Sequence, residues 1–199
     1  AGLTPDVEAT SVNHQGMVQY YASDWDFIVT RAEANGRLVS TEDGSLVVKA
    51  PDATAQAVLS LTYGGNILDF EAYMDARHQY GAAQVYAWDA ANQEMLEIEG
   101  ADAGASTPGN LSESDLAAVI GLDASVFKHG GQLSDSELQA WADGQRLKSG
   151  YAKVRGRVRI QGFGQVKPGD MIELNGVGDR FNGRALVSGV RHEINSRNR

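Results

Sequence analysis

The chain has 199 residues, which is enough for one large domain or two small ones, and 42% of them are hydrophobic, as expected for a folded globular protein. It contains no cysteine, which excludes disulfides, thiol nucleophiles and thiolate metal sites. No apolar run approaches the roughly 20 residues that span a bilayer, and the first residues show neither the basic nor the apolar region of a signal peptide.

Charge is distributed unevenly along the chain, whose net charge is −9. Residues 1–145 contain 22 Asp and Glu against 5 Lys and Arg, a net −17, whereas residues 146–199 contain 4 against 12, a net +8. A chain polarised in this way can pair its own halves, pair with a neighbouring copy, or present its basic part to an acidic partner.

The first predicted elements are a short strand, a helix and a hairpin. Residues 17–21 predict the strand. The helix begins after Ser23, an N-cap candidate with Asp26 three residues later, and it ends before Gly36, which suits the C′ position. Two short strands then flank Asp43-Gly44, a dipeptide typical of a hairpin turn.

Strands dominate from residue 56 onward. Residues 67–76 alternate with period two, which predicts that Leu68, Phe70 and Met74 point inward. Similar runs at 57–63, 79–88 and 93–99 complete an expected antiparallel meander of about four strands.

Two helices separate this meander from the later strands. Ser112 is placed to cap a helix over 113–120, and Ser134 with Glu137 forms a capping box that opens a helix over 135–149. Strands are expected again at 151–161, 171–174 and 185–194.

These elements predict an α+β protein that is mainly β. The strand groups 56–100 and 151–199 are expected to form the halves of one antiparallel barrel or sandwich, with a helical excursion at about 112–149 packed on its outside. The predicted domains are therefore a small strand–helix–hairpin domain over residues 1–55 and a barrel domain over residues 56–199.

Residues suited to catalysis do not form a recognisable pattern. The histidines have no metal-binding spacing, and no G-x-S-x-G elbow is present. The Gly-rich segments at 162–164 and 176–178 lack the remainder of a phosphate-binding loop and predict β-turns. The four histidines are His14, His78, His129 and His192.

Carboxylates gather at Asp69, Glu71 and Asp75, on one face of a predicted strand. Paired carboxylates can hydrolyse glycosides, but nothing indicates the aromatic-lined cleft that such a site uses, so a solvated acidic face is the favoured interpretation. The sequence thus predicts no catalytic residue, no metal ligand and no cofactor.

A row of cations is the sharpest local feature. Alternation along the segment 153–160 places four cationic side chains on one strand face, where they repel one another unless negative charge lies opposite. The candidates for that charge are the acidic strands 67–76 and 93–99 of the same chain, the same strands of a second copy, or nucleic acid. Protein pairing is favoured, because the row has no interleaved aromatic residue and the whole protein is acidic. The four residues are Lys153, Arg155, Arg157 and Arg159.

The segment VQYYASDWDFI at 18–28, followed by Arg31-Ala32-Glu33 and Asn35-Gly36, resembles the strand and helix of Vgr-type spike proteins and phage late-control D proteins. Later segments resemble the returning strands of the same family, in the same order: GRVRIQG at 156–162, KPGD at 167–170, GVGDRFNG at 176–183 and VSGVRH at 187–192. The residues that match the helix motif are Ser23, Asp24, Trp25, Phe27, Arg31, Glu33 and Gly36.

The resemblance implies a barrel of the phage tail-hub type and a trimeric baseplate hub of a contractile injection system. Such a system is a phage tail, a type VI secretion apparatus or a tail-like particle. The implied partners are further copies of the protein, the inner-tube protein, and the spike or tip with other baseplate proteins, without specific nucleic acid and without stable membrane insertion. The implied location is the bacterial or phage-infected cytoplasm during assembly, and then a particle delivered to a target envelope.

This sequence departs from the family in extent, since the preceding barrel, the oligonucleotide-binding-like domain and the β-helix of the spike have no counterpart in it. We therefore expect a fragment of a hub protein that works by assembly and is not an enzyme, with the cation row as an electrostatic seam or a lumen-facing stripe. The rival hypotheses are a tail-associated cell-wall hydrolase module and a stand-alone carbohydrate- or protein-binding module.

Overall fold

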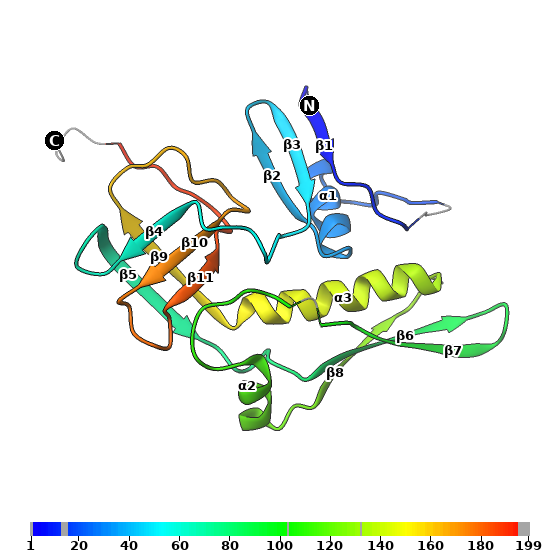
Figure 1. The fold of residues 1–199 in the computed structure, drawn as a ribbon. Helices are drawn as coiled ribbons and strands as arrows, with labels where there is room; N and C mark the ends of the chain where they lie inside the picture. Colours follow the sequence, from blue (N-terminus) through cyan, green and yellow to red (C-terminus); the bar gives the residue numbers. More distant parts are fainter. Residues whose placement is uncertain (1, 13–15, 103, 132, 195–199) are drawn as a thin grey trace. The chain divides into compact units, whose positions relative to one another are not determined.

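A computed structural model describes residues 2–12, 16–102, 104–131 and 133–194. The chain forms two compact units, each assembled from separate stretches of sequence (Figure 1). The first unit contains Ala1–Pro51, Asp75–Ala105 and Leu111–Lys153; the second contains Asp52–Met74, Ser106–Asn110 and Val154–Arg199. This grouping differs from the predicted domains, because two stretches beyond residue 55 belong with the N-terminal segment.

The N-terminal part of the first unit holds a three-stranded sheet and one helix. Strand β3 (Ser45–Lys49) lies in the centre, parallel to β1 (Thr4–Val7) and antiparallel to β2 (Leu38–Glu42). The hairpin predicted between β2 and β3 is confirmed, and its turn residues Asp43 and Gly44 both have positive φ.

Helix α1 (Asp24–Glu33) begins at the predicted cap, where the Ser23 Oγ accepts a hydrogen bond from the Asp26 N–H at 3.1 Å. The strand predicted at residues 17–21 is wrong, since these residues pair with no other strand. An apolar extended segment becomes a strand only where a neighbouring strand accepts its backbone hydrogen bonds.

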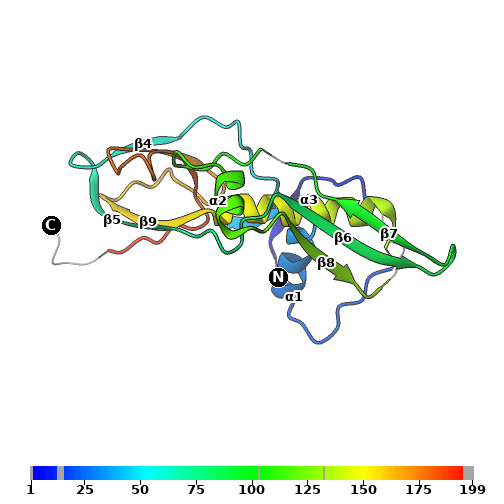
Figure 2. The same ribbon diagram turned by 90° about the horizontal axis from the view of Figure 1, so that it is seen from below.

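The larger part of the first unit packs a helix on a sheet. Strand β6 (Ala82–Asp89) lies between β7 (Glu94–Glu99), its antiparallel hairpin partner, and the parallel β8 (Ala124–His129). Helix α3 (Asp135–Ala152) runs along one face of this sheet (Figures 1 and 2). The core between them consists of Val85, Ala87, Leu138 and Ala142.

Helix α2 (Glu113–Ile120) has the predicted cap, and the capping box at Ser134 is confirmed for α3. Two elements of this region differ from the sequence prediction. Strand β8 was not predicted, because its parallel partner β6 lies about 40 residues earlier in the chain. Helix α3 continues to Ala152, so the strand expected from residue 151 starts only at Val154.

The second unit contains two small sheets. In one, β10 (Met171–Asn175) pairs antiparallel with β11 (Gly183–Leu186) and parallel with β4 (Leu59–Thr62). In the other, β5 (Ile67–Met74) pairs antiparallel with β9 (Val154–Ile160). Their shared core consists of Leu61, Ile67, Ile172 and Leu174, against which Phe70, Val158 and Ile160 pack.

Strand β5 departs from the predicted alternation at one residue. The register shifts between Ile67 and Asp69, which leaves Leu68 outside the pairing and 63% exposed, although it was expected to point inward. A bulge of this kind changes the face of the residue that it inserts. Phe70 remains on the inner side with the core cluster, as predicted.

The chain is mainly β with some helices, as predicted, but the described residues form no closed barrel. They form separate small sheets, and three strand pairs are parallel. The expected four-strand antiparallel meander is also wrong: β6 and β7 form a hairpin, whereas β5 pairs with β9, about 90 residues further along the chain. Alternating sequence patterns identify strands but do not identify their partners.

Candidate assembly surface

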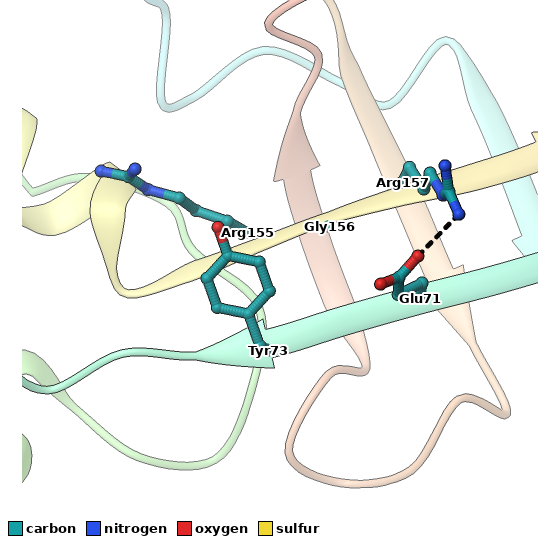
Figure 3. Close-up of a pocket in the computed structure, with 5 residues that line it drawn as sticks. All are labelled: Glu71, Tyr73, Arg155, Gly156 and Arg157. Carbon is teal, nitrogen blue, oxygen red and sulfur yellow. Dashed lines mark ion pairs between the residues drawn. The ribbon is translucent and has the colours of Figure 1, made fainter.

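The outer face of the β5–β9 sheet carries opposite charges on its two strands. Register places Asp69 opposite Arg159, Glu71 opposite Arg157, and Tyr73 opposite Arg155. Figure 3 shows the last two of these pairs. Since alternate residues of both strands pack toward the core, these six side chains share the solvent-exposed face. Part of the negative charge predicted to lie opposite the cations therefore comes from Asp69 and Glu71 of the same chain.

Only one of these cross-strand pairs closes into an ion pair. The Arg157 Nη2 lies 2.8 Å from the Glu71 Oε2, and both side chains are largely exposed. An exposed pair of this kind stabilises a fold by about 0.2–1 kcal/mol. Arg155 and Arg159 form no hydrogen bond or ion pair with the described residues, so two guanidinium groups on this face keep their N–H donors for a partner.

A shallow hollow of about 360 Å³ lies on this face, lined by Glu71, Tyr73, Arg155, Gly156 and Arg157 (Figure 3). Its floor needs glycine, because a Cβ at Gly156 would overlap the carbonyl oxygen of Glu71 and crowd Ala72. The Tyr73 ring and the Arg155 side chain stand at one end, and the Glu71–Arg157 ion pair stands at the other (Figure 3). The arrangement suits a carboxylate-bearing partner, since a free guanidinium binds carboxylates through paired N–H donors.

Lys153 does not belong to this row, contrary to the sequence interpretation. It is the C-cap of α3, has helical backbone angles and is only 3% exposed. Its Nζ donates a hydrogen bond to the Leu111 carbonyl at 2.8 Å. Burial lowers the pKa of this lysine, an effect that Glu113 and Asp115 oppose. Because the helix reaches Ala152, strand alternation starts after Lys153, and the exposed row contains three arginines.

A buried ion pair near Lys153 was not predicted. The Arg146 Nη1 lies 2.8 Å from the Glu113 Oε2 and donates to the Tyr80 carbonyl at 2.9 Å. Burial raises the pKa of Glu113, and Arg146 opposes that rise. The signal for Arg146 was its spacing of four and eight residues from Ala142 and Leu138, which places it on the buried stripe of α3.

The residues of the helix motif build and anchor α1. Ser23 caps the helix, Asp24 accepts a hydrogen bond from Gln19 at 2.9 Å, and Arg31 lies in the last turn. Glu33 forms an ion pair with Lys148 of α3 at 2.6 Å, and Gly36 has the positive φ expected after the helix. Phe27 is half-buried, whereas Trp25 is 47% exposed.

A second hollow, of about 210 Å³, lies in the first unit and includes His129 and Trp141, whose rings are 5.6 Å apart. The His129 Nδ1 lies 3.1 Å from the Gly131 nitrogen and 3.0 Å from the Gly131 carbonyl oxygen, so it can bond to the Gly131 backbone in either tautomer. The other lining residues are Thr30, Arg31, Ala34, Asn35, Leu133 and Glu137.

In the part of the chain that the structure describes, no three His, Asp or Glu side chains are grouped as metal ligands. His14 lies outside that part. No helix among the described residues is long and apolar enough to cross a membrane. The expectation that the protein is not an enzyme stays a prediction.

A family model described as the Alg8 N-terminal domain matches residues 1–196, which is nearly the whole chain. The chain belongs to the Alg8 N-terminal domain family. No curated protein matches it.

Two solved structures share the fold of this Alg8 N-terminal domain. One is the 43 kDa tail protein of prophage MuSo2 from Shewanella oneidensis, with a TM-score of 0.57 and 12% identity over 94% of this chain and 54% of that one. The other is the tail protein from Neisseria meningitidis MC58, with a TM-score of 0.62 and 12% identity over 94% of this chain and 55% of that one. The chain thus has the fold of part of these tail proteins and spans about half their length.

Proposed function

We propose that this chain is a structural part of a phage-tail-like injection machine, in which it forms part of the hub that joins the central spike to the inner tube. The observation that carries the proposal is the fold, which the chain shares over 94% of its length with two phage tail proteins. The Vgr and late-control D resemblance of residues 18–36 and 156–192 supports the hub as the position within the tail.

The proposed mode of action is assembly without catalysis. A hub must hold several partners at once, and the β5–β9 face offers two unpaired guanidinium groups beside an aromatic side chain for such a contact. The proposed partners are further copies of the protein, to make a trimer, together with the inner-tube protein and the spike or tip proteins. The proposal includes no specific nucleic acid and no stable insertion into a membrane.

Co-purification tests this role. The full-length protein, with an affinity tag, is produced in the organism that encodes it, and the proteins that remain bound are identified by mass spectrometry. The expected result is recovery of tube, sheath and spike proteins in a reproducible ratio to the tagged protein. A protein recovered without any tail component would contradict the proposal, and so would clearing of peptidoglycan by the purified chain in a zymogram.

A further inference from the structure

Strand β9 has a free edge as well as a charged face. Its sheet has two strands, so β5 covers one edge of β9, and no described strand pairs with the other. Charged side chains along an exposed edge prevent a strand from pairing with a like copy. The arginines at 155, 157 and 159 therefore exclude a second β9 but favour a strand that carries acids at the same period.

Strand β7 has the complementary properties. It is an edge strand of the β7–β6–β8 sheet. Helix α3 covers one face of that sheet and leaves the opposite face exposed. Met95, Glu97 and Glu99 alternate along its exposed face. The Glu99 carbonyl accepts a hydrogen bond from Gln139 at 3.2 Å, so the free backbone edge extends from Glu94 to Ile98, and the exposed Glu99 side chain lies at its end on the same face as Glu97.

The acids of β7 are available to a partner. Glu94 and Glu99 form no side-chain hydrogen bond or ion pair with the described residues, and Glu97 accepts only from the Tyr86 hydroxyl, at 2.8 Å. Exposed apolar side chains border both rows: Trp88 and Met95 beside the acids, and Tyr73 beside the arginines. Each strand thus offers a backbone edge, a row of one charge and an apolar flank.

We propose that β7 of one copy of this protein adds to the free edge of β9 of a second copy, with its glutamates opposite the arginines. The inference deepens the proposed function, on which it rests, by naming the contact through which copies join. The two surfaces differ, so the contact is head-to-tail: after it forms, one copy keeps a free β9 and the other keeps a free β7 for a further neighbour. Repetition of such a contact gives a ring where the rotation between copies closes, and an open filament where it does not.

Charge specifies this pairing over the alternatives. A β9–β9 contact would oppose arginines, and a β7–β7 contact would oppose glutamates, so both are disfavoured. The backbone hydrogen bonds of the added strand supply affinity without sequence preference, whereas the period-two charges select the partner.

Two charge-reversed variants test the contact. R155E/R159E makes β9 acidic, and E97R/E99R makes β7 basic, so neither variant pairs with itself. We expect each to self-associate about tenfold more weakly than the unmodified chain, measured by analytical ultracentrifugation, with an unchanged circular dichroism spectrum. A mixture of the two should associate again, because each variant then meets opposite charge on the other.

The absence of cysteine allows a second test by disulfide trapping. The mid-strand residues are used, so that E97C in one tagged copy meets R157C in another whichever way the strands run. Oxidation should give a mixed dimer, whereas R157C with T41C, on the exposed edge strand β2, should give none. Equal trapping of both pairs, or unchanged self-association of both charge variants, would overturn the inference.

The outcome is separable from that of the proposed function. If copies do not join through β7 and β9 but the full-length protein still co-purifies with tail components, the contact is wrong and the tail role stands. If the mixed dimer forms but no tail component is recovered, the contact stands and the tail role is wrong.

Discussion

At the scale of single residues, glycine decides how closely β5 and β9 approach. Gly156 lies opposite Ala72, and a side chain there would meet the Glu71 backbone and Ala72. Gly in a strand often marks such a close approach of another backbone. Which backbone approaches it could not be read from the sequence, since β5 lies about 85 residues away.

Gly156→Ala should therefore destabilise the fold by about 1–3 kcal/mol, the usual cost of forcing an extra methyl group into a packed site. The measurement is urea unfolding followed by circular dichroism. Gly164→Ala is the matched control, because nothing lies within 4 Å of a Cβ at that position. Equal midpoints for the two variants would contradict the packing described here.

Glu113 gives a prediction about pH. Burial raises its pKa in the folded chain, so the folded state binds this proton more readily than the unfolded state does. Its contribution to the free energy of unfolding is thus fully present below its ordinary pKa of 4.5 and is lost as the pH rises through the raised value.

Glu113→Gln should consequently match the unmodified chain in acid and be at least as stable at pH 7, where the charged carboxylate is disfavoured. Thermal unfolding across that pH range measures the difference, with Glu94→Gln as the exposed control. A variant that is less stable than the unmodified chain at pH 7 would show that the Arg146 ion pair outweighs the cost of burial.

At the scale of elements, the helices were predictable and the strand partners were not. Caps such as Ser23 and Ser134 act within one turn, so a short stretch of sequence specifies where a helix begins. Strand pairing depends on distant segments: β9 was recognised as a strand, but its partner β5 was one of several possible acidic strands. Likewise, the charged face of β9 was predicted, but Lys153 was wrongly assigned to it, because α3 continues to Ala152 and Lys153 is its C-cap.

The capping box of α3 can be tested directly. The Ser134 Oγ accepts a hydrogen bond from the Glu137 N–H at 3.3 Å, and the Glu137 carboxylate accepts from the Ser134 N–H at 2.8 Å. Ser134→Ala removes the first of these and should cost about 1 kcal/mol. Urea unfolding gives the value, and Ser188→Ala, at an exposed position outside any helix or strand, should change it little.

At the scale of the whole molecule, the charge asymmetry seen in the sequence follows the two units. The first unit carries 19 acidic and 8 basic residues, and the second carries 7 acidic and 9 basic residues. An acidic unit and a mildly basic unit in each copy provide opposite charges that a contact between copies could use. The fold alone does not identify the partners. The charged rows on β7 and β9 therefore carry the proposal of how copies join.

Salt should weaken the assembly. Exposed charges more than about 8 Å apart are largely screened at physiological ionic strength, and further salt shortens that range. Association of the chain with itself, followed by analytical ultracentrifugation, should therefore fall as sodium chloride is raised, while R155E/R159E should show little further loss. Association that strengthens with salt would indicate an apolar interface instead.

The position of this chain in a tail can be determined by electron cryomicroscopy of tail particles purified from the organism that encodes the protein. We expect density for this fold in a ring between the inner tube and the spike, with copies of the chain in contact with one another. Particles that assemble fully without any density for this chain would contradict it.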